Sequence, residues 1–247
     1  MATSYAMFKK EITDFLKFTF DKDATILDVG AGEGTYLPYL QDYFTNIEAV
    51  EVFLPNIINY DLENRYKKVY NIDIRNFTYD YYDIIIFGDV IEHLEVKEAQ
   101  KVLKYALERC KQLIVAVPYK AQQGIEEDNI YEIHKQDDLT DQIMKERYPF
   151  LINVYKNRKY GYYVKEVNMK NYVVKAMYAF NDMEEKNEYG CDTPRKVGDI
   201  FNCTKERYEY LQSKGAVMLM GIDEIKEADF EEVSKKKTTK KSTKSKK

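Results

Sequence analysis

The sequence predicts an α/β fold in which helices cover both faces of a mostly parallel sheet. Two observations lead to this prediction. Short runs rich in Ile and Val alternate with helical stretches between residues 25 and 117, which is typical of parallel strands joined by crossover helices. The runs are also nearly continuous in apolar character, as strands that are buried on both faces must be.

The expected elements follow one another along the chain. An amphipathic opening helix spans about Ser4–Phe18, where apolar residues repeat at helical spacing. The expected strands are Thr25–Val29, Ile47–Val52, Lys68–Ile72, Tyr82–Phe87 and Gln112–Val117. The expected helices between them are Thr35–Phe44, Pro55–Arg65 and Val96–Cys110. Two further runs, Phe150–Tyr155 and Tyr160–Glu166, predict an antiparallel hairpin that completes a sheet of seven strands.

We expect two folded parts and a tail. The main domain is placed at residues 1–168, a small β-rich module of mixed α and β structure at 172–222, and a charged, Lys-rich tail, expected to be disordered, at 223–247. In the module, Thr204 is expected to cap a helix at Lys205–Ser213. A polar loop that contains Gly190 and Pro194 precedes it.

Composition and charge exclude several classes of protein. No stretch approaches the roughly 20 apolar residues of a membrane span, and the three cysteines form no CxxC pair, so we expect a cytoplasmic protein without a disulfide framework or a membrane partner. The net charge is −4, but the last thirteen residues hold eight lysines and no acids; without them 30 basic residues face 42 acidic ones, a charge of −12. That balance argues against a large nucleic-acid-binding surface.

The segment Asp28-Val-Gly-Ala-Gly-Glu-Gly34 lies at the end of the first predicted strand and contains the residue types expected to bind a ligand. Glycines let the backbone turn tightly and approach a ligand closely, and Glu51, at the end of the second strand, can accept hydrogen bonds from both hydroxyls of a ribose. A nicotinamide dinucleotide would also have a ribose there. However, its fingerprint is G-x-G-x-x-G, whereas this chain has G-x-G-x-G, and Asp28 suits an ammonium group better than a pyrophosphate.

The stretch from Ile26 to Tyr119 resembles the core of class I S-adenosylmethionine-dependent methyltransferases, which have a Rossmann-like seven-stranded sheet. The segment Ile26–Gly34 resembles their first motif, and Tyr82–Leu94 resembles the fourth-strand motif of a subgroup with a Glu-His-Leu signature. The resemblance implies S-adenosyl-L-methionine as the cofactor. The residues that it and the loop chemistry assign to cofactor binding are Asp28, Gly30, Ala31, Gly32, Glu51, Asp73, Ile74, Asp89 and Val90.

Methyl transfer needs a base only if the acceptor loses a proton, as a hydroxyl does. Our catalytic candidates are His93, His134 and Glu92. We expect no bound metal ion; the candidates for ligands, if one binds, are Asp89, Glu92, His93 and His134, which resemble the magnesium-binding arrangement of some methyltransferases that act on small molecules or RNA 2′-hydroxyls. Asp89 stands where that arrangement has Glu, so its reach is shorter.

The absence of two motifs narrows the range of possible methyl acceptors. No Asp/Asn-Pro-Pro-aromatic tetrapeptide follows the fourth strand and no Pro-Cys nucleophile is present, which argues against methylation of DNA bases. We therefore expect a small-molecule or glycan acceptor with a hydroxyl or an amine, facing the segment Ala121–Tyr148. The module resembles small β-rich modules of tailed-phage proteins around Arg195–Leu211, which suggests a phage-encoded protein with a docking role. The alternatives are a phage structural or adaptor protein without turnover and an NAD-binding oxidoreductase.

Overall fold

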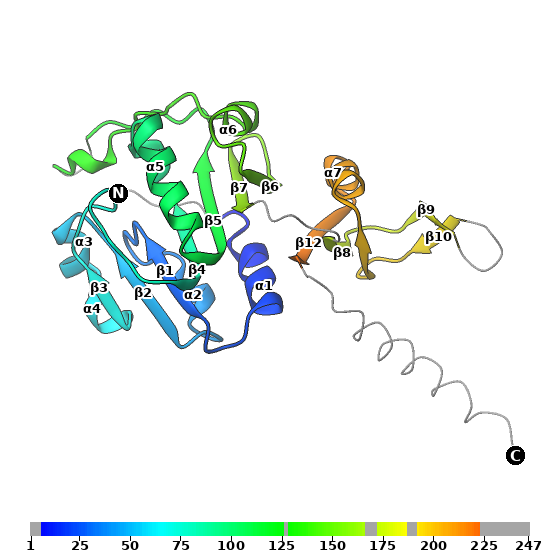
Figure 1. The fold of residues 1–247 in the computed structure, drawn as a ribbon, viewed down its shortest axis with the longest axis horizontal. Coiled ribbons are helices and arrows are strands. Elements are labelled where there is room, and N and C mark those ends of the chain that lie inside the picture. The colour runs from blue at the N-terminus through cyan, green and yellow to red at the C-terminus, as the bar shows by residue number, and fades with distance from the viewer. Residues whose placement is uncertain (1–5, 126–127, 166–171, 187–191, 223–247) are drawn as a thin grey trace, which may run out of the picture. The chain divides into compact units, whose positions relative to one another are not determined.

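The computed structural model describes residues 6–125, 128–165, 172–186 and 192–222. The chain divides into two compact units, Met1–Val167 and Asn168–Lys247 (Figure 1). Among the described residues, each helix is too short or too polar to cross a membrane.

Seven strands form the sheet of the first unit. They are β1 Thr25–Val29, β2 Asn46–Val50, β3 Lys68–Tyr70, β4 Tyr82–Gly88, β5 Cys110–Pro118, β6 Leu151–Lys156 and β7 Tyr160–Lys165. Their order is β3-β2-β1-β4-β5-β7-β6 (Figure 1). Strands β1 to β5 are parallel, whereas β7 pairs antiparallel with β5 and with β6. The predicted sheet, mostly parallel with a final antiparallel hairpin, is confirmed.

Helices join these strands. The described ones are α1 Lys9–Thr19, α2 Leu37–Leu40, α3 Leu54–Asn59, α4 Leu62–Arg65, α5 Val96–Leu107 and α6 Asp141–Arg147, with 3-10 turns η1 at Ile91–His93 and η2 at Ile130–Glu132. The predicted helix Pro55–Arg65 is two helices, because Asp61 takes a left-handed conformation with φ 52°. The opening helix begins only at Lys9, since Phe8 is also left-handed with φ 61°.

Helix α6 lies inside the segment Ala121–Tyr148, for which the sequence predicted no helix or strand. The Thr140 hydroxyl accepts a hydrogen bond from Ile143 N–H at 3.1 Å and caps the helix. Met144 is buried on its inner face. Met144 and the adjacent Ile143 are the helix's apolar contacts with the core, and two neighbouring residues give too little periodicity to indicate a helix from sequence.

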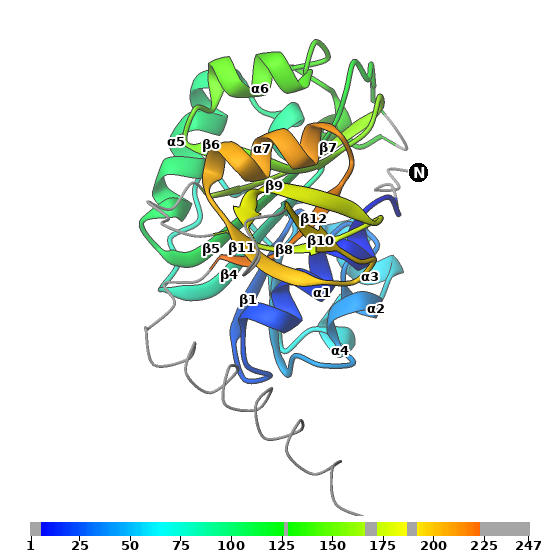
Figure 2. The same cartoon turned by 90° about the vertical axis from the view of Figure 1, so that its right-hand side faces the viewer.

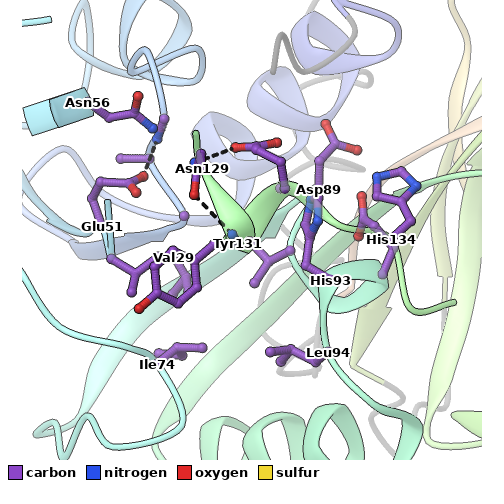
Figure 3. Close-up of a pocket in the computed structure, with 18 of the residues that line it drawn as sticks. Val29, Glu51, Asn56, Ile74, Asp89, His93, Leu94, Asn129, Tyr131 and His134 are labelled. Carbon is purple, nitrogen blue, oxygen red and sulfur yellow. Dashed lines mark hydrogen bonds between the residues drawn. The ribbon is translucent and has the colours of Figure 1, made fainter. Parts of the chain in front are cut away.

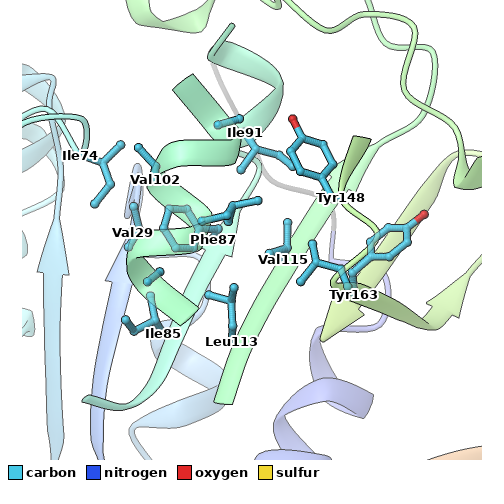
Figure 4. Close-up of a cluster of buried hydrophobic side chains, with 14 of the residues drawn as sticks. Val29, Ile74, Ile85, Phe87, Ile91, Val102, Leu113, Val115, Tyr148 and Tyr163 are labelled. Atoms are coloured by element: carbon cyan, nitrogen blue, oxygen red, sulfur yellow. The ribbon is translucent and has the colours of Figure 1, made fainter. Parts of the chain in front are cut away.

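The central strands are buried on both faces, as their continuous apolar character predicted. Alternate residues of β1, β4 and β5 pack with α5 into one cluster (Figure 4), which includes Leu27, Val29, Ile85, Phe87, Leu113, Val115, Ala99 and Leu103. Their neighbours on the opposite face are also fully buried, namely Ile26, Ile84, Ile86 and Ile114. This core fixes the carboxyl ends of β1 and β4, where the functional segments begin.

The second unit contains a three-stranded antiparallel sheet in the order β11-β8-β12, with bounds Ile200–Cys203, Tyr172–Ala176 and Val217–Ile222. Helix α7, Lys205–Ser213, packs against β8 and β12 (Figure 2). The Thr204 hydroxyl accepts a hydrogen bond from Arg207 N–H at 3.2 Å, so the predicted cap is confirmed. The predicted Lys-rich tail lies outside the described residues.

The prediction of a polar loop around Gly190 and Pro194 in this unit is partly wrong. A hairpin of β9, Phe180–Lys186, and β10, Asp192–Arg195, occupies it. Pro194 lies within β10 of this two-stranded sheet, where its missing N–H is tolerated, whereas Gly190 lies outside the described residues. Buried Asp182 forms ion pairs with Arg195 at 3.4 Å and Arg207 at 3.0 Å.

We predict that Gly88→Ala destabilises the first unit. A Cβ at Gly88 would overlap the ring of Tyr36, whose hydroxyl is held by that of Tyr162 at 2.8 Å. Overpacking of this kind costs about 1–3 kcal/mol. The matched control is Gly124→Ala, because nothing lies within 4 Å of the added Cβ. Urea unfolding followed by near-UV circular dichroism should show a lower midpoint for the first variant only; equal midpoints would contradict the packing argument.

Candidate active site

The glycine-rich loop after β1 adopts a backbone that only glycine tolerates well. Gly30, Gly32 and Gly34 have φ values of 68°, 54° and 73°. A Cβ at Gly30 would lie 2.5 Å from a methyl carbon of Val90, so the loop after β1 and the segment after β4 touch closely. Gly30 N–H and Ala31 N–H donate to the Val50 carbonyl at 2.8 and 3.2 Å, which ties the loop to the end of β2.

Arg65 of α4 supports this loop from outside. Its guanidinium donates to the carbonyls of Glu33 at 2.9 Å and Tyr60 at 3.1 Å, and it lies against Gly34. Sequence reasoning missed this role, because nothing in the spacing of Arg65 distinguishes it from a surface residue.

Glu51 follows β2 and is 5% exposed. Its two carboxylate oxygens accept hydrogen bonds from Gly32 N–H at 2.7 Å and Phe53 N–H at 2.8 Å. Burial raises the pKa of Glu51, while these hydrogen bonds and one from Asn56 oppose the rise. The two carboxylate oxygens have about four lone pairs between them, so Glu51 can accept a hydrogen bond from a ligand in addition to these three.

Asp73 follows β3 and is bound by Arg75. The Arg75 guanidinium donates to both carboxylate oxygens, at 3.0 Å from Nε and 2.5 Å from Nη2. Burial raises the pKa of Asp73, but the Arg75 contacts outweigh it and the pKa is lowered. Asp73 therefore stays ionised, and its oxygens already have a partner.

Asp28 lies behind the cavity and does not line it. It is 1% exposed, and Tyr66 O–H donates to its carboxylate at 2.6 Å. Burial raises the pKa of Asp28 to about 6, although Tyr66 and Lys9 oppose the rise. The interpretation that Asp28 faces an ammonium group of the cofactor therefore lacks the expected geometry, because the side chain of a residue within a central strand points into a packed face.

Lys9 of α1 is also buried, at 1% exposure, with its Nζ 4.5 Å from the centre of the Tyr36 ring. Burial lowers the pKa of Lys9 to about 8, and the charges of Asp89, Asp28 and Glu33 oppose the fall. The sequence did not predict a buried lysine whose charge interacts with three acids. The amphipathic pattern of the opening helix does not show which residues of the sheet the helix packs against.

Asp89 follows β4 with a left-handed backbone, φ 56°. Tyr160 O–H of β7 donates to its carboxylate at 2.5 Å. The turn η1 that follows contains only Ile91–His93, so Asp89 lies outside it. Asp89 is therefore oriented by Tyr160 rather than by a helix.

Glu92, His93 and His134 come together, with one ligand atom from each within 4.8 Å of the others. The two imidazole rings meet edge to face, 4.7 Å between centroids. Burial, and then the neighbouring His134, lowers the pKa of His93 to about 4. Burial and the charges of Asp89 and Glu132 hold the pKa of Glu92 well above its usual value. Among the described residues, neither Glu92 carboxylate oxygen has a hydrogen-bond partner.

His134 is positioned by the segment after β5. Its Nδ1 lies 2.7 Å from the carbonyl oxygen of Ala121. A carbonyl can only accept, so Nδ1 carries the proton and Nε2 of the neutral ring has a free lone pair. The following backbone is tied to η1, because Lys135 N–H and Gln136 N–H both donate to the Glu92 carbonyl, at 2.8 and 3.0 Å.

These segments enclose one cavity of about 530 Å³ (Figure 3). One side consists of strand ends and the loops after them; the other consists of the roof segment, residues 128–135, together with Ala121–Gln123. The predicted residues on its wall are Gly30, Ala31, Gly32, Glu51, Asp73, Ile74, Asp89, Val90, Glu92, His93 and His134. The structure thus brings every predicted site residue except Asp28 to one cavity. The cavity lies at the carboxyl ends of β1 and β4, where the strand order reverses, as expected for α/β sheets.

Comparison with known protein families shows which family the chain belongs to. Residues 4–150 match a family described as a methyltransferase domain. The chain belongs to this methyltransferase family. Comparison with curated proteins finds no match.

Several solved structures resemble this methyltransferase at low identity. An S-adenosylmethionine-dependent methyltransferase from Clostridium acetobutylicum is 14% identical, with 64% of this chain and 92% of that chain covered and a TM-score of 0.49. One from Aquifex aeolicus is 16% identical, with 66% and 93% covered and a TM-score of 0.47. A Burkholderia thailandensis 1,6-didemethyltoxoflavin-N1-methyltransferase with bound S-adenosylhomocysteine is 14% identical, with 64% and 75% covered and a TM-score of 0.48. The Glu-His-Leu subgroup and a phage origin are not shown by these comparisons.

We predict that the burial of Asp28 makes the protein's stability depend on pH below neutrality. A pKa of about 6 in the folded state against 3.8 means that the native protein binds the proton more tightly, so this contribution is present at low pH and is lost as the pH rises through 6. About two pKa units correspond to about 3 kcal/mol at most.

Asp28→Asn removes the titration and keeps an oxygen for Tyr66. The unfolding free energy of the variant minus that of the natural protein should therefore rise between pH 4 and 6 and then level off, as measured by urea unfolding at each pH. A difference that stays constant over this range would show that Asp28 is not perturbed.

Proposed function

We propose that this methyltransferase transfers a methyl group from S-adenosylmethionine to a hydroxyl or amine of a small molecule or glycan. The observation that carries the proposal is the convergence of the glycine loop, Glu51, the Asp73–Ile74 segment and Asp89 on one cavity that also holds Glu92, His93 and His134. When bound, the cofactor supplies an electrophilic methyl group on a sulfonium sulfur.

The residues of the cavity suit an adenosyl cofactor. The Gly30–Gly32 backbone admits a ligand without a Cβ in the way, and Glu51 offers lone pairs to ribose hydroxyls. The apolar side chains of Val52 and Ile74 line the part of the wall beyond Glu51, where a purine would be held. Asp89 adds a carboxylate on the far side of the loop, suited to the cationic part of the cofactor.

Among the three catalytic candidates, we assign the base role to His134. A base is most effective when its pKa lies near the working pH, and the pKa of about 4 makes His93 a weak base. Burial holds the pKa of Glu92 well above its usual value, which favours its protonated form and disfavours a role as base. His134 has its Nε2 lone pair available because Nδ1–H is bound to Ala121. A hydroxyl acceptor that reaches this lone pair would lose its proton to His134.

A divalent metal ion bound by Glu92, His93 and His134 is a second candidate. Two imidazoles and a carboxylate suit Mn²⁺, Fe²⁺ or Zn²⁺. The buried Glu92 carboxylate without a partner among the described residues favours this candidate, because a cation would compensate its burial. The ion would act as a Lewis acid on the acceptor oxygen and replace the base role of His134.

The cofactor assignment is tested by calorimetric titration with S-adenosylhomocysteine and NAD. We expect binding of the adenosyl compound only. Glu51→Ala should weaken it by about 2 kcal/mol, which is roughly 30-fold in Kd, since a hydrogen bond to a charged group contributes on that order. Glu63→Ala is the matched control, because Glu63 is an exposed acid of α4 outside the cavity. Failure of the natural protein to bind S-adenosylhomocysteine would overturn the proposed function.

The metal candidate is tested by Mn²⁺ binding, followed by electron paramagnetic resonance. If the metal site exists, the natural protein binds one Mn²⁺ per chain, and Glu92→Gln and His134→Ala each lose it, while Glu63→Gln retains it. If Mn²⁺ does not bind, the base role of His134 stands alone, and His134→Ala should lower turnover of a hydroxyl acceptor by roughly 10²–10⁴-fold without changing the Kd of S-adenosylhomocysteine.

A further inference from the structure

The turn η2, Ile130–Glu132, presents an aromatic side chain to the cofactor side of the cavity. Tyr131 lines the same cavity as Val29, Glu51 and Ile74, although it comes from the other wall. Figure 3 shows the Tyr131 side chain reaching from the roof segment toward the side of the cavity on which Val29 and Ile74 lie. No described ring stacks on it, and its side chain remains 40% exposed.

Side-chain hydrogen bonds hold the turn η2 in place. Asn129 is 4% exposed; its carbonyl oxygen accepts from Tyr131 N–H at 3.0 Å, and its amide donates to Glu132 at 3.1 Å. Gln123 donates to the other oxygen of Glu132 at 2.7 Å. The position of the Tyr131 backbone is therefore fixed before any ligand arrives, so its ordering adds little to the entropy lost on binding.

The wall opposite contributes aliphatic side chains. Val52, Ile72 and Ile74 line the cavity there, together with the Asp73–Arg75 ion pair. An aromatic ring on one side and aliphatic side chains on the other form a slot for a flat heterocycle. Stacking of such a ring on an aromatic side chain needs no base-specific hydrogen bond, since every base has a π-face.

We propose that Tyr131 is a positioning residue whose ring stacks on the purine of the cofactor, so that η2 closes the cofactor site from above. The inference rests on the proposed function, because it requires an adenosyl cofactor. It extends that function to the segment that follows β5. Asn129 supports the contact indirectly by bracing the turn.

The absence of tryptophan from the chain gives a direct test. Tyr131→Trp introduces a single indole whose emission reports on a stacked purine. We expect a saturable change in its fluorescence with S-adenosylhomocysteine and with adenosine, but none with L-homocysteine, which lacks the purine. The matched control is Tyr81→Trp, because Tyr81 is 57% exposed and lies outside the cavity; its emission should not respond.

Binding constants give the second readout. Tyr131→Ala should raise the Kd of S-adenosylhomocysteine roughly tenfold or more, and Asn129→Ala should raise it less, while Tyr131→Phe should change it by less than about twofold because stacking does not use the hydroxyl. Circular dichroism would establish that the variants fold.

The outcomes separate this inference from the function on which it rests. If the natural protein binds S-adenosylhomocysteine but Tyr131→Ala binds it equally well and the Tyr131→Trp emission is silent, the stacking role is wrong and the cofactor assignment stands. If the natural protein does not bind S-adenosylhomocysteine, both are overturned.

Discussion

The hydrogen bond from Gly32 N–H to the Glu51 carboxylate joins the loops after β1 and β2, and the cavity depends on it. Gly32 can direct its N–H there only because its backbone is left-handed. The same loop approaches Val90 so closely at Gly30 that a methyl group would not fit, which connects it to the segment after β4. Three strand ends are thus held in one arrangement, and the roof segment is then attached to the third of them through the Glu92 carbonyl.

Around this arrangement the protein concentrates negative charge. The carboxylates of Glu51, Asp73 and Asp89 line the cavity, and Asp28 is buried behind it. Lys9 is a buried cation on which the charges of Asp89, Asp28 and Glu33 act, and its burial lowers its pKa. Such a field favours a ligand that carries positive charge, as S-adenosylmethionine does at its sulfonium and ammonium groups.

The sequence predicted the sheet and the part of the cavity wall that the strand ends supply, because both follow from local patterns. Continuous apolar runs indicate buried strands, and parallel strands bring their carboxyl ends to one edge. The orientation of individual side chains was less predictable. Asp28 was expected to face the cofactor but binds Tyr66, since its place in a central strand directs it into the protein.

Contacts between distant segments gave no local signal at all. Tyr160 meets Asp89 across 71 residues and Arg65 meets the glycine loop across about 30, so neither pairing has a spacing that a single sequence displays. The hairpin β9–β10 was missed because its polar residues and Pro194 are typical of a loop. The tertiary structure, rather than a local sequence pattern, determines the two pairings and the hairpin.

The attachment of the roof segment to η1 has a consequence for how acceptor preference can change. Gln136 donates through its side chain to the carbonyls of Ile91 and Leu94, at 2.8 and 3.0 Å, in addition to its backbone bond to Glu92. Lys135 and Gln136 are therefore held against the catalytic turn, and the neighbouring His134 is held by the backbone carbonyls of Ala121 and Gln123. These bonds use only backbone groups of Ala121 and Gln123, so a change of side chain at Ala121 or Gln122 would alter the cavity wall beside His134 while leaving the histidines in place. These two positions are therefore a natural point for diversification, by evolution or by design, of the substrates that one unchanged catalytic centre serves.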